Sequence, residues 1–222
     1  MKTTTISEDL TEKCRLQFIT HHNDVYSYVD SARLALEGGC RWIQLRMKEA
    51  TASVLEETAR TVQTMCWEYG ATFIIDDHVS VVQKIHADGV HLGRNDMPVA
   101  EARKILGDRF IIGSTIHSFG DLSSVLRDSR PDYFGCGPFR FTTTKKNLAP
   151  VLGLEGYRDL LDRMREADIH IPEVAIGGIQ REDIPQLLVC RVQDIALSRS
   201  ILNATDPVEE MRHVVDLIKT NR

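Results

Sequence analysis

The chain of 222 residues lacks the features that mark several common classes of protein. Its five cysteines are widely spaced, and no Cys-x-x-Cys pair is present to suggest a zinc or redox centre. It has no excess of positive charge, because the formal net charge is -5. We therefore expect neither a nucleic-acid partner nor binding to an anionic membrane. The basic residues are instead expected to act locally, on a small anionic ligand.

Long hydrophobic runs are missing as well. No apolar run approaches the roughly 18 residues that a membrane-spanning helix needs, and residues 1–5 contain no hydrophobic signal core. Unpaired, scattered cysteines are typical of a reducing compartment. We predict a cytoplasmic protein that does not enter a membrane.

The sequence does contain a regular alternation of short apolar runs with amphipathic stretches. The runs, rich in β-branched residues, cover 16–20, 42–45, 72–75, 89–92, 110–113, 133–135, 174–176 and 194–197. Between two of them, residues 54–65 keep the 3.6-residue period of an amphipathic helix. Strands that alternate strictly with helices at this number predict an α/β fold, a (β/α)8 TIM barrel.

A doubly wound open sheet would show the same alternation. Its usual Gly-x-Gly-x-x-Gly signature after the first strand is absent, and Gly38 and Gly39 precede the second strand instead. No linker or low-complexity stretch divides the chain. We predict one barrel domain over residues 1–222, with residues 1–14 as an N-terminal extension or extra helix.

In such a barrel the chemistry lies at the carboxyl ends of the strands. After the second run, alternation places Gln44, Arg46 and Lys48 on one face of an extended segment. These hydrogen-bond donors, two of them cationic, would point into the barrel mouth. The alternative is an ordinary strand end whose long side chains reach for solvent.

Carboxylates follow the third and fourth runs. Adjacent strands would bring Asp77 and Asp96 together, and two hard carboxylates at one mouth suit Mg²⁺. Either residue alone could instead cap a helix. His78 and His91 have no partner at the usual ligand spacing, so we assign them no role.

Hydroxyl groups follow the fifth run. Thr115 is a candidate to reach a ligand, and Ser118 is placed to cap the next helix. His117 is either a general base or a residue that holds the loop.

Two further segments suit anions. In residues 142–146, three threonines and two lysines follow a glycine-rich turn and could hold a phosphate or pyrophosphate, or form a solvated loop. Gly177, Gly178 and Ser198 end the last two strands, where bare backbone N–H groups often bind a monophosphate; a simple turn is the alternative. The sequence thus indicates one site for a metal-bound diphosphate and another for a monophosphate.

Five motifs, in order along the chain, resemble those of the thiamine phosphate synthase family. They are residues 44–48, Asp76-Asp77, residues 91–96, Gly137-Pro138 with residues 142–145, and residues 176–179. That family is a (β/α)8 barrel that joins a hydroxymethylpyrimidine diphosphate to a thiazole monophosphate and releases pyrophosphate. The resemblance implies a Mg²⁺-dependent transferase of thiamine biosynthesis with these small molecules as its partners, and a homo-oligomer is compatible with it.

The resemblance also assigns residues. It places the pyrimidine diphosphate on Gln44, Leu45, Arg46, Met47, Lys48, Asp76, Thr115 and Lys145, with Arg46, Lys48, Lys145 and Thr115 as the catalytic set. It gives Mg²⁺ to Asp77 and Asp96. It places the thiazole phosphate on Thr142, Thr143, Thr144, Gly178, Ser198 and Arg199.

The chain also departs from the family pattern. The family usually has Asn where Asp76 stands, and Arg199 adds a side chain that could contact phosphate. One alternative function is a thiazole tautomerase of the same fold, whose histidine His117 could match; another is a non-catalytic barrel that binds a phosphate ligand. Retention of both Asp77 and Asp96 beside the cations favours the synthase.

Overall fold

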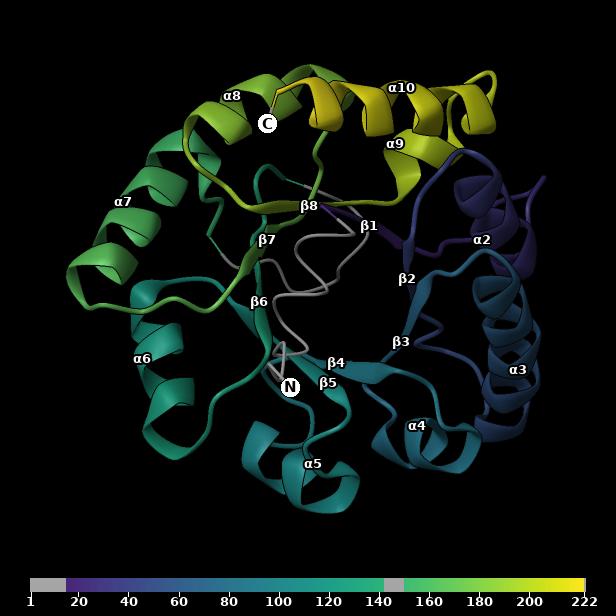
Figure 1. Ribbon diagram of the computed structural model, residues 1–222, viewed down its shortest axis with the longest axis horizontal. Coiled ribbons are helices and arrows are strands. Elements are labelled where there is room, and N and C mark those ends of the chain that lie inside the picture. Colours follow the sequence, from purple (N-terminus) through teal and green to yellow (C-terminus); the bar gives the residue numbers. More distant parts are fainter. Residues whose placement is uncertain (1–14, 142–149, 222) are drawn as a thin grey trace, which may run out of the picture.

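The computed structural model describes residues 15–141 and 150–221, in which the strands close into a barrel. All neighbouring strands are parallel and follow chain order, and β1 pairs with β8 to complete the ring (Figure 1). The strands are β1 (Leu16–Ile19), β2 (Trp42–Leu45), β3 (Thr72–Asp76), β4 (Gly89–Leu92), β5 (Ile111–Ile116), β6 (Tyr133–Cys136), β7 (Glu173–Ala175) and β8 (Asp194–Leu197). The prediction of a (β/α)8 TIM barrel is confirmed.

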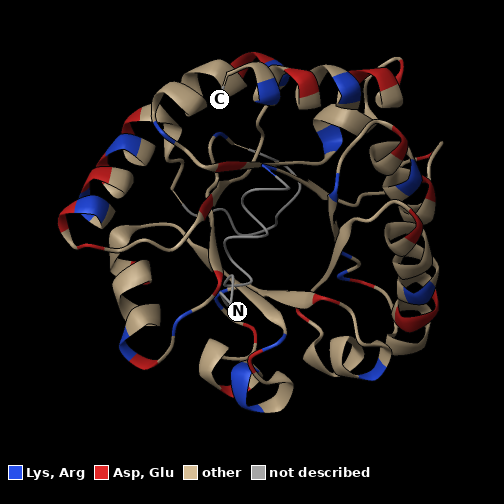
Figure 2. Ribbon diagram, viewed as in Figure 1, with Lys and Arg blue, Asp and Glu red and all other residues tan. Residues whose placement is uncertain are grey.

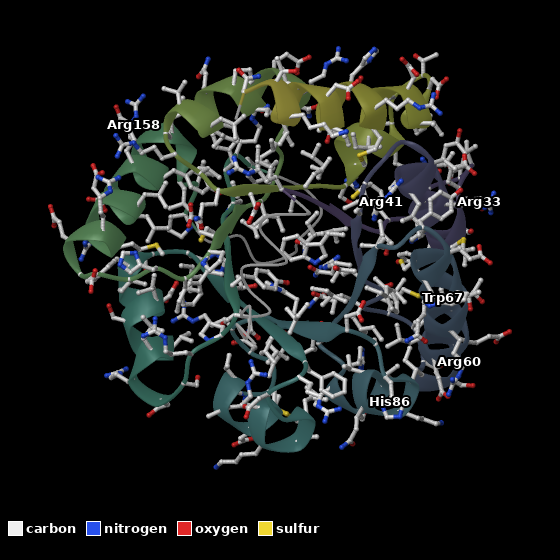
Figure 3. The ribbon with its side chains drawn as sticks, in the orientation of Figure 1. Arg33, Arg41, Arg60, Trp67, His86 and Arg158 are labelled. Atoms are coloured by element: carbon white, nitrogen blue, oxygen red, sulfur yellow. The ribbon has the colours of Figure 1, made fainter. Side chains whose placement is uncertain are left out.

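Helices surround the barrel on its outside (Figure 1). They are α2 (Tyr28–Glu37), α3 (Ala52–Glu68), α4 (Val79–Ile85), α5 (Val99–Leu106), α6 (Phe119–Asp128), α7 (Gly153–Glu166), the 3-10 turn η1 (Arg181–Asp183), α8 (Ile184–Val189), α9 (Arg199–Leu202) and α10 (Pro207–Thr220). Charges of both signs are spread along them (Figure 2), and Arg33, Arg60 and Arg158 lie at the outer rim (Figure 3). Among the described residues, none of these helices combines the length and the apolar character needed to cross a membrane.

The helices begin where local chemistry predicts. Ser27 and Asp30 form a capping box at α2, since each side chain accepts a hydrogen bond from the other residue's backbone N–H. Ser118 caps α6 as expected, and Pro207 opens α10, where its missing N–H costs nothing.

Alternation along the strands divides the core into two parts. One small cluster fills the barrel interior and consists of Ile19, Trp42, Ile74, Ile111, Tyr133, Val174 and Ala196, with Ile176 packed against it. A larger cluster lies between the strands and the helices. These apolar side chains fill the barrel, so it is not an open pore. The polar side chains available to a ligand lie at its carboxyl-terminal mouth.

Two buried acids mark the opposite, amino-terminal end of the barrel. Glu173 and Asp194 are the first residues of β7 and β8 and are 5% and 1% exposed. Burial raises the pKa of Glu173 to about 8 and that of Asp194 to about 7. Neither carboxylate oxygen of Asp194 has a hydrogen-bond partner in the part of the chain that the structure describes.

Candidate active site

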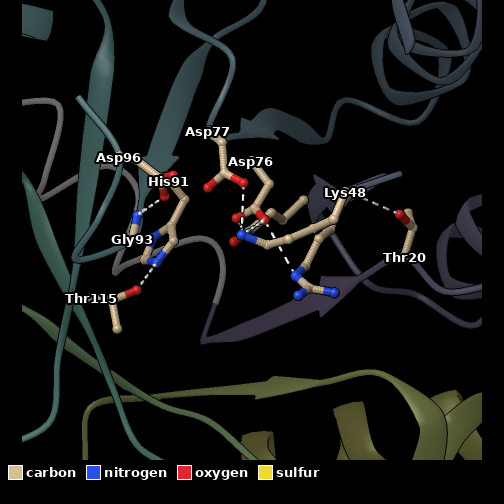
Figure 4. A network of polar contacts seen from close by, with 10 residues as sticks. Thr20, Lys48, Asp76, Asp77, His91, Gly93, Asp96 and Thr115 are labelled. Carbon is tan, nitrogen blue, oxygen red and sulfur yellow. Dashed lines mark hydrogen bonds and ion pairs between the residues drawn. The ribbon is translucent and has the colours of Figure 1, made fainter. Parts of the chain in front are cut away.

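The end of β2 presents its donors to Asp76, the last residue of β3. Gln44 Nε2 donates a 2.7 Å hydrogen bond to Asp76 Oδ1. Arg46 Nε lies 3.3 Å and Lys48 Nζ 3.8 Å from Asp76 Oδ2. The three side chains that alternation placed on one face therefore converge on one carboxylate (Figure 4).

Leu45 and Met47 face the other way. Both side chains are buried in the cluster beneath the helices, because they alternate with the inward-facing donors. A ligand in the mouth would meet these two residues through their backbone.

Asp77 lies just beyond β3 in an uncommon backbone conformation. Its φ is 66°, and its N–H donates a 2.9 Å hydrogen bond to the carbonyl of His91. Its Oδ2 lies 2.7 Å from Lys48 Nζ, whereas its Oδ1 is buried and receives no hydrogen bond from the described residues. The capping position of α4 belongs to His78, so Asp77 does not cap that helix.

Asp96 turns back toward Asp77 in the loop after β4. Its Oδ2 accepts a 2.7 Å hydrogen bond from the N–H of Gly93, which is visible in Figure 4. Burial, and then the neighbouring carboxylate of Asp77, raise the pKa of Asp96. The structure thus brings the two aspartates within range of each other's charge.

This pair fits a divalent cation. A positive ion near both carboxylates would oppose the rise in the pKa of Asp96 that burial and Asp77 cause, and it would give a partner to Asp77 Oδ1, which accepts no hydrogen bond from the described residues. Within residues 15–141 and 150–221, no group of three His, Cys, Asp or Glu side chains could hold a metal by itself. The pair would therefore supply only part of the ligand set of a divalent cation, and water or a bound ligand would have to supply the rest.

Thr115 and His91 meet inside the barrel mouth. Thr115 Oγ1 lies 2.9 Å from His91 Nε2, and His91 Nδ1 lies 2.9 Å from the hydroxyl of Tyr133. No role was predicted for His91 from the sequence, although its inward-facing position in a predicted strand was a usable signal.

His117 holds a loop. Its ring Nδ1 contacts the carbonyl of Gly137, and its N–H donates to Asp121 at the start of α6. Of the two interpretations offered by the sequence, these contacts favour the one that anchors the loop.

A cavity of about 520 Å³ opens beside the carboxylate cluster, at the ends of β1, β7 and β8. Gly178 and Ser198 line it as expected, and so does Arg46, which is also paired with Asp76. The φ of Gly178 is 70°, and a Cβ there would lie 2.5 Å from Arg140 Cγ. A glycine at this position therefore allows the positive φ of the turn and leaves room for the Arg140 side chain.

Arg199 lines this cavity together with His21, for which no role was predicted from the sequence. Its Nε donates to His21 Nε2 at 2.9 Å, and both residues line the cavity. Burial, followed by the charge of Arg199, lowers the pKa of His21, so this imidazole remains a neutral acceptor. Thr142, Thr143, Thr144 and Lys145 lie outside the described residues, and their roles stay predictions.

The family model described as thiamine monophosphate synthase matches residues 16–201. The chain belongs to the thiamine monophosphate synthase family. It is 61% identical over 202 residues to the thiamine-phosphate synthase of Phocaeicola vulgatus, an alignment that covers 91% of this chain and 97% of the relative. It is 35% identical over 208 residues to that of Pyrococcus abyssi, covering 92% and 96%.

A solved structure agrees with these relatives. The thiamine phosphate pyrophosphorylase from Pyrococcus furiosus superposes with a TM-score of 0.84 at 33% identity, covering 96% of this chain and 98% of that one. The chain is thus similar over most of its length to thiamine monophosphate synthases, which are transferases of thiamine biosynthesis. The tautomerase and the non-catalytic barrel receive no support.

Proposed function

We propose that this synthase transfers the hydroxymethylpyrimidine group from its diphosphate to the ring nitrogen of a thiazole monophosphate. The observation that carries the proposal is the position of Arg46, which pairs with Asp76 in the carboxylate cluster and also lines the neighbouring cavity. A diphosphate on one side and a monophosphate on the other would place the two reacting atoms on either side of this residue.

The diphosphate would bind where the cations are. Arg46, Lys48 and the hydroxyl of Thr115 would contact its oxygens, as would Lys145. Gln44 and Asp76 would hold the pyrimidine edge through the hydrogen-bonding groups that they now direct at each other. The cations and the Thr115 hydroxyl would neutralise the negative charge that grows on the leaving diphosphate. They would therefore stabilise the transition state more than the bound substrate.

Asp77 and Asp96 would hold Mg²⁺ beside the diphosphate. The ion would supply further charge neutralisation to the leaving group. Lys48 pairs with Asp77 in the substrate-free protein; because its side chain is 45% exposed, it can turn toward a phosphate oxygen at little cost.

The thiazole phosphate would occupy the cavity. Gly178, the backbone at Ser198 and the side chain of Arg199 would bind its phosphate, with the predicted contributions of residues 142–144. The carbon–oxygen bond between the pyrimidine methylene and the diphosphate breaks, and the diphosphate oxygen keeps the electron pair of that bond. The lone pair of the thiazole nitrogen then forms the new carbon–nitrogen bond, and no general base is required because that nitrogen carries no proton.

The proposal is tested by incubating the purified protein with both substrates and Mg²⁺. We expect pyrophosphate and thiamine phosphate in equal amounts, and a large loss of rate when EDTA replaces the metal. Absence of both products would contradict the proposed reaction, and full activity in EDTA would contradict the role of Mg²⁺. Size-exclusion chromatography would determine the oligomeric state, and cell fractionation would test the predicted cytoplasmic location.

A further inference from the structure

A column of polar side chains runs through the otherwise apolar barrel interior to the mouth. Gln17 Nε2 lies 3.4 Å from the Tyr133 hydroxyl, which lies 2.9 Å from His91 Nδ1. His91 Nε2 in turn lies 2.9 Å from Thr115 Oγ1. The four residues come from β1, β6, β4 and β5, so the column depends on the closed barrel.

Two glycines reserve the space that these rings fill. A Cβ on Gly113 would lie 2.1 Å from Tyr133 Cζ, and one on Gly135 would lie 2.8 Å from His91 Cε1. Gly113 is in register with His91 on one side and Tyr133 on the other. Trp42 packs its ring edge-to-face on Tyr133, with centroids 5.0 Å apart. The rings are therefore fixed by packing before any ligand binds.

The contacts define a direction for the protons. Burial raises the pKa of Tyr133, so the phenol keeps its proton. The Gln17 amide donates to the phenol oxygen, which leaves the phenol proton for His91 Nδ1. Because His91 Nδ1 accepts the phenol proton, the ring proton of His91 lies on Nε2, from which it is donated to Thr115 Oγ1.

We propose that Tyr133 and His91 are positioning residues that fix the Thr115 hydroxyl as a donor toward an oxygen of the bound diphosphate. A hydroxyl that already accepts a hydrogen bond from the barrel interior directs its own proton toward the mouth. The reaction then gains a donor that needs no reorientation as charge develops. This inference rests on the proposed function, which gives Thr115 its contact with the diphosphate.

The tautomer of His91 is measured without substrate, in protein labelled with ¹⁵N-histidine. We expect the wild type to show His91 protonated on Nε2 and unprotonated on Nδ1. Tyr133→Phe keeps the ring and its packing on Trp42 but removes the donor, so the Nδ1-protonated form should become populated. Tyr157→Phe is the matched control, because Tyr157 is also fully buried but its hydroxyl donates to Cys136 instead; the His91 signal should not change.

Kinetics separate positioning from a general structural effect. We expect Tyr133→Phe to lower kcat about 10-fold, the cost of one misdirected hydrogen bond, with the KM for the thiazole phosphate unchanged. In a Thr115→Val background the same substitution should have no further effect on kcat. His91→Gln, which keeps a donor, should retain more activity than His91→Leu.

Three results would overturn the inference: an Nδ1-protonated His91 in the wild type, an unaltered tautomer in Tyr133→Phe, or an equal loss of kcat with and without the Thr115 hydroxyl. The tautomer is read in the free protein, so it stands apart from the proposed reaction. A wild-type protein that formed no product would refute the reaction while leaving the tautomer result intact.

Discussion

The ammonium of Lys48 lies 2.7 Å from Oδ2 of Asp77, while Oδ1 of the same carboxylate is buried without a hydrogen bond from any described residue. One oxygen of the carboxylate is therefore paired with a partly exposed cation, and the same carboxylate helps to raise the pKa of Asp96. In the proposed function, the substrate and the metal would replace both arrangements and would compensate the negative charge of this carboxylate.

The metal assignment predicts the behaviour of Asp96→Asn. We expect this variant to lose on the order of 100-fold in kcat at limiting Mg²⁺, because one of two carboxylate ligands becomes neutral. Mg²⁺ titration of the initial rate measures the effect. Asp128→Asn, at the exposed end of α6, is the control; an unchanged Mg²⁺ dependence in Asp96→Asn would refute the assignment.

Asp76 permits a test of its departure from the family pattern. Asp76→Asn removes a charge that pairs with Arg46 and Lys48 but keeps an oxygen that can accept from Gln44. The two cations would be freer to bind phosphate, so we expect the KM for the pyrimidine diphosphate to fall several-fold. Asp76→Leu, which also removes the acceptor, should raise that KM; a rise in Asp76→Asn as well would show that the carboxylate itself is needed.

Gly178→Ala should weaken binding of the thiazole phosphate. The new methyl group would meet Arg140 Cγ at 2.5 Å and occupy the turn that lines the cavity, so we expect its KM to rise about 10-fold. Gly70→Ala has a similar backbone strain, with φ of 61°, but no atom within 4 Å of the added Cβ. That control should lose about 1 kcal/mol of stability with both KM values unchanged, and equal KM effects in the two variants would argue against a phosphate site at Gly178.

The sequence predicted the barrel because eight apolar runs and the helices between them repeat the same local pattern. It was less accurate where a strand carries polar residues. The fifth strand was expected at 110–113 but extends over Ile111–Ile116, since Ser114 pairs with both neighbouring strands and Thr115 pairs with β6, which keeps both residues in extended form. Local propensity does not record that pairing.

The candidate site could be predicted only in part. Gln44, Arg46 and Lys48 alternate along one strand, so their common direction follows from the pleat. The contacts of His91 with Tyr133 and of Arg199 with His21 join strands or loops far apart in the chain. They depend on barrel register, which no local spacing determines.

The buried acid at the base of β8 predicts how stability changes with pH. The folded-state pKa values of Asp194 and Glu173, about 7 and about 8, lie above those of the unfolded chain. Their stabilising contribution is complete below about pH 4 and is lost as pH rises through 7 and 8. The free energy of unfolding should therefore fall with rising pH in this range, by up to about 1.4 kcal/mol per pH unit for each group.

Asp194→Asn should flatten that decline, because the amide does not ionise. Urea unfolding at several pH values between 5 and 8 measures the slope. Asp159→Asn, whose side chain is 70% exposed, is the control and should leave the slope as it is. A wild-type stability that rises from pH 5 to pH 8 would contradict the assignment.

The left-handed backbone at Asp77 limits how this position can vary. Asp77 has a φ of 66°, and its N–H is hydrogen-bonded to the carbonyl of His91. Asp, Asn and Gly are the residue types that adopt this left-handed conformation at low cost. Most single substitutions would disturb the turn and the charge together. The substitutions that preserve the backbone here keep the shape of the mouth but remove its negative charge. Under the proposed assignment of Mg²⁺ to Asp77, a change of metal dependence could therefore arise at this position without a change of fold.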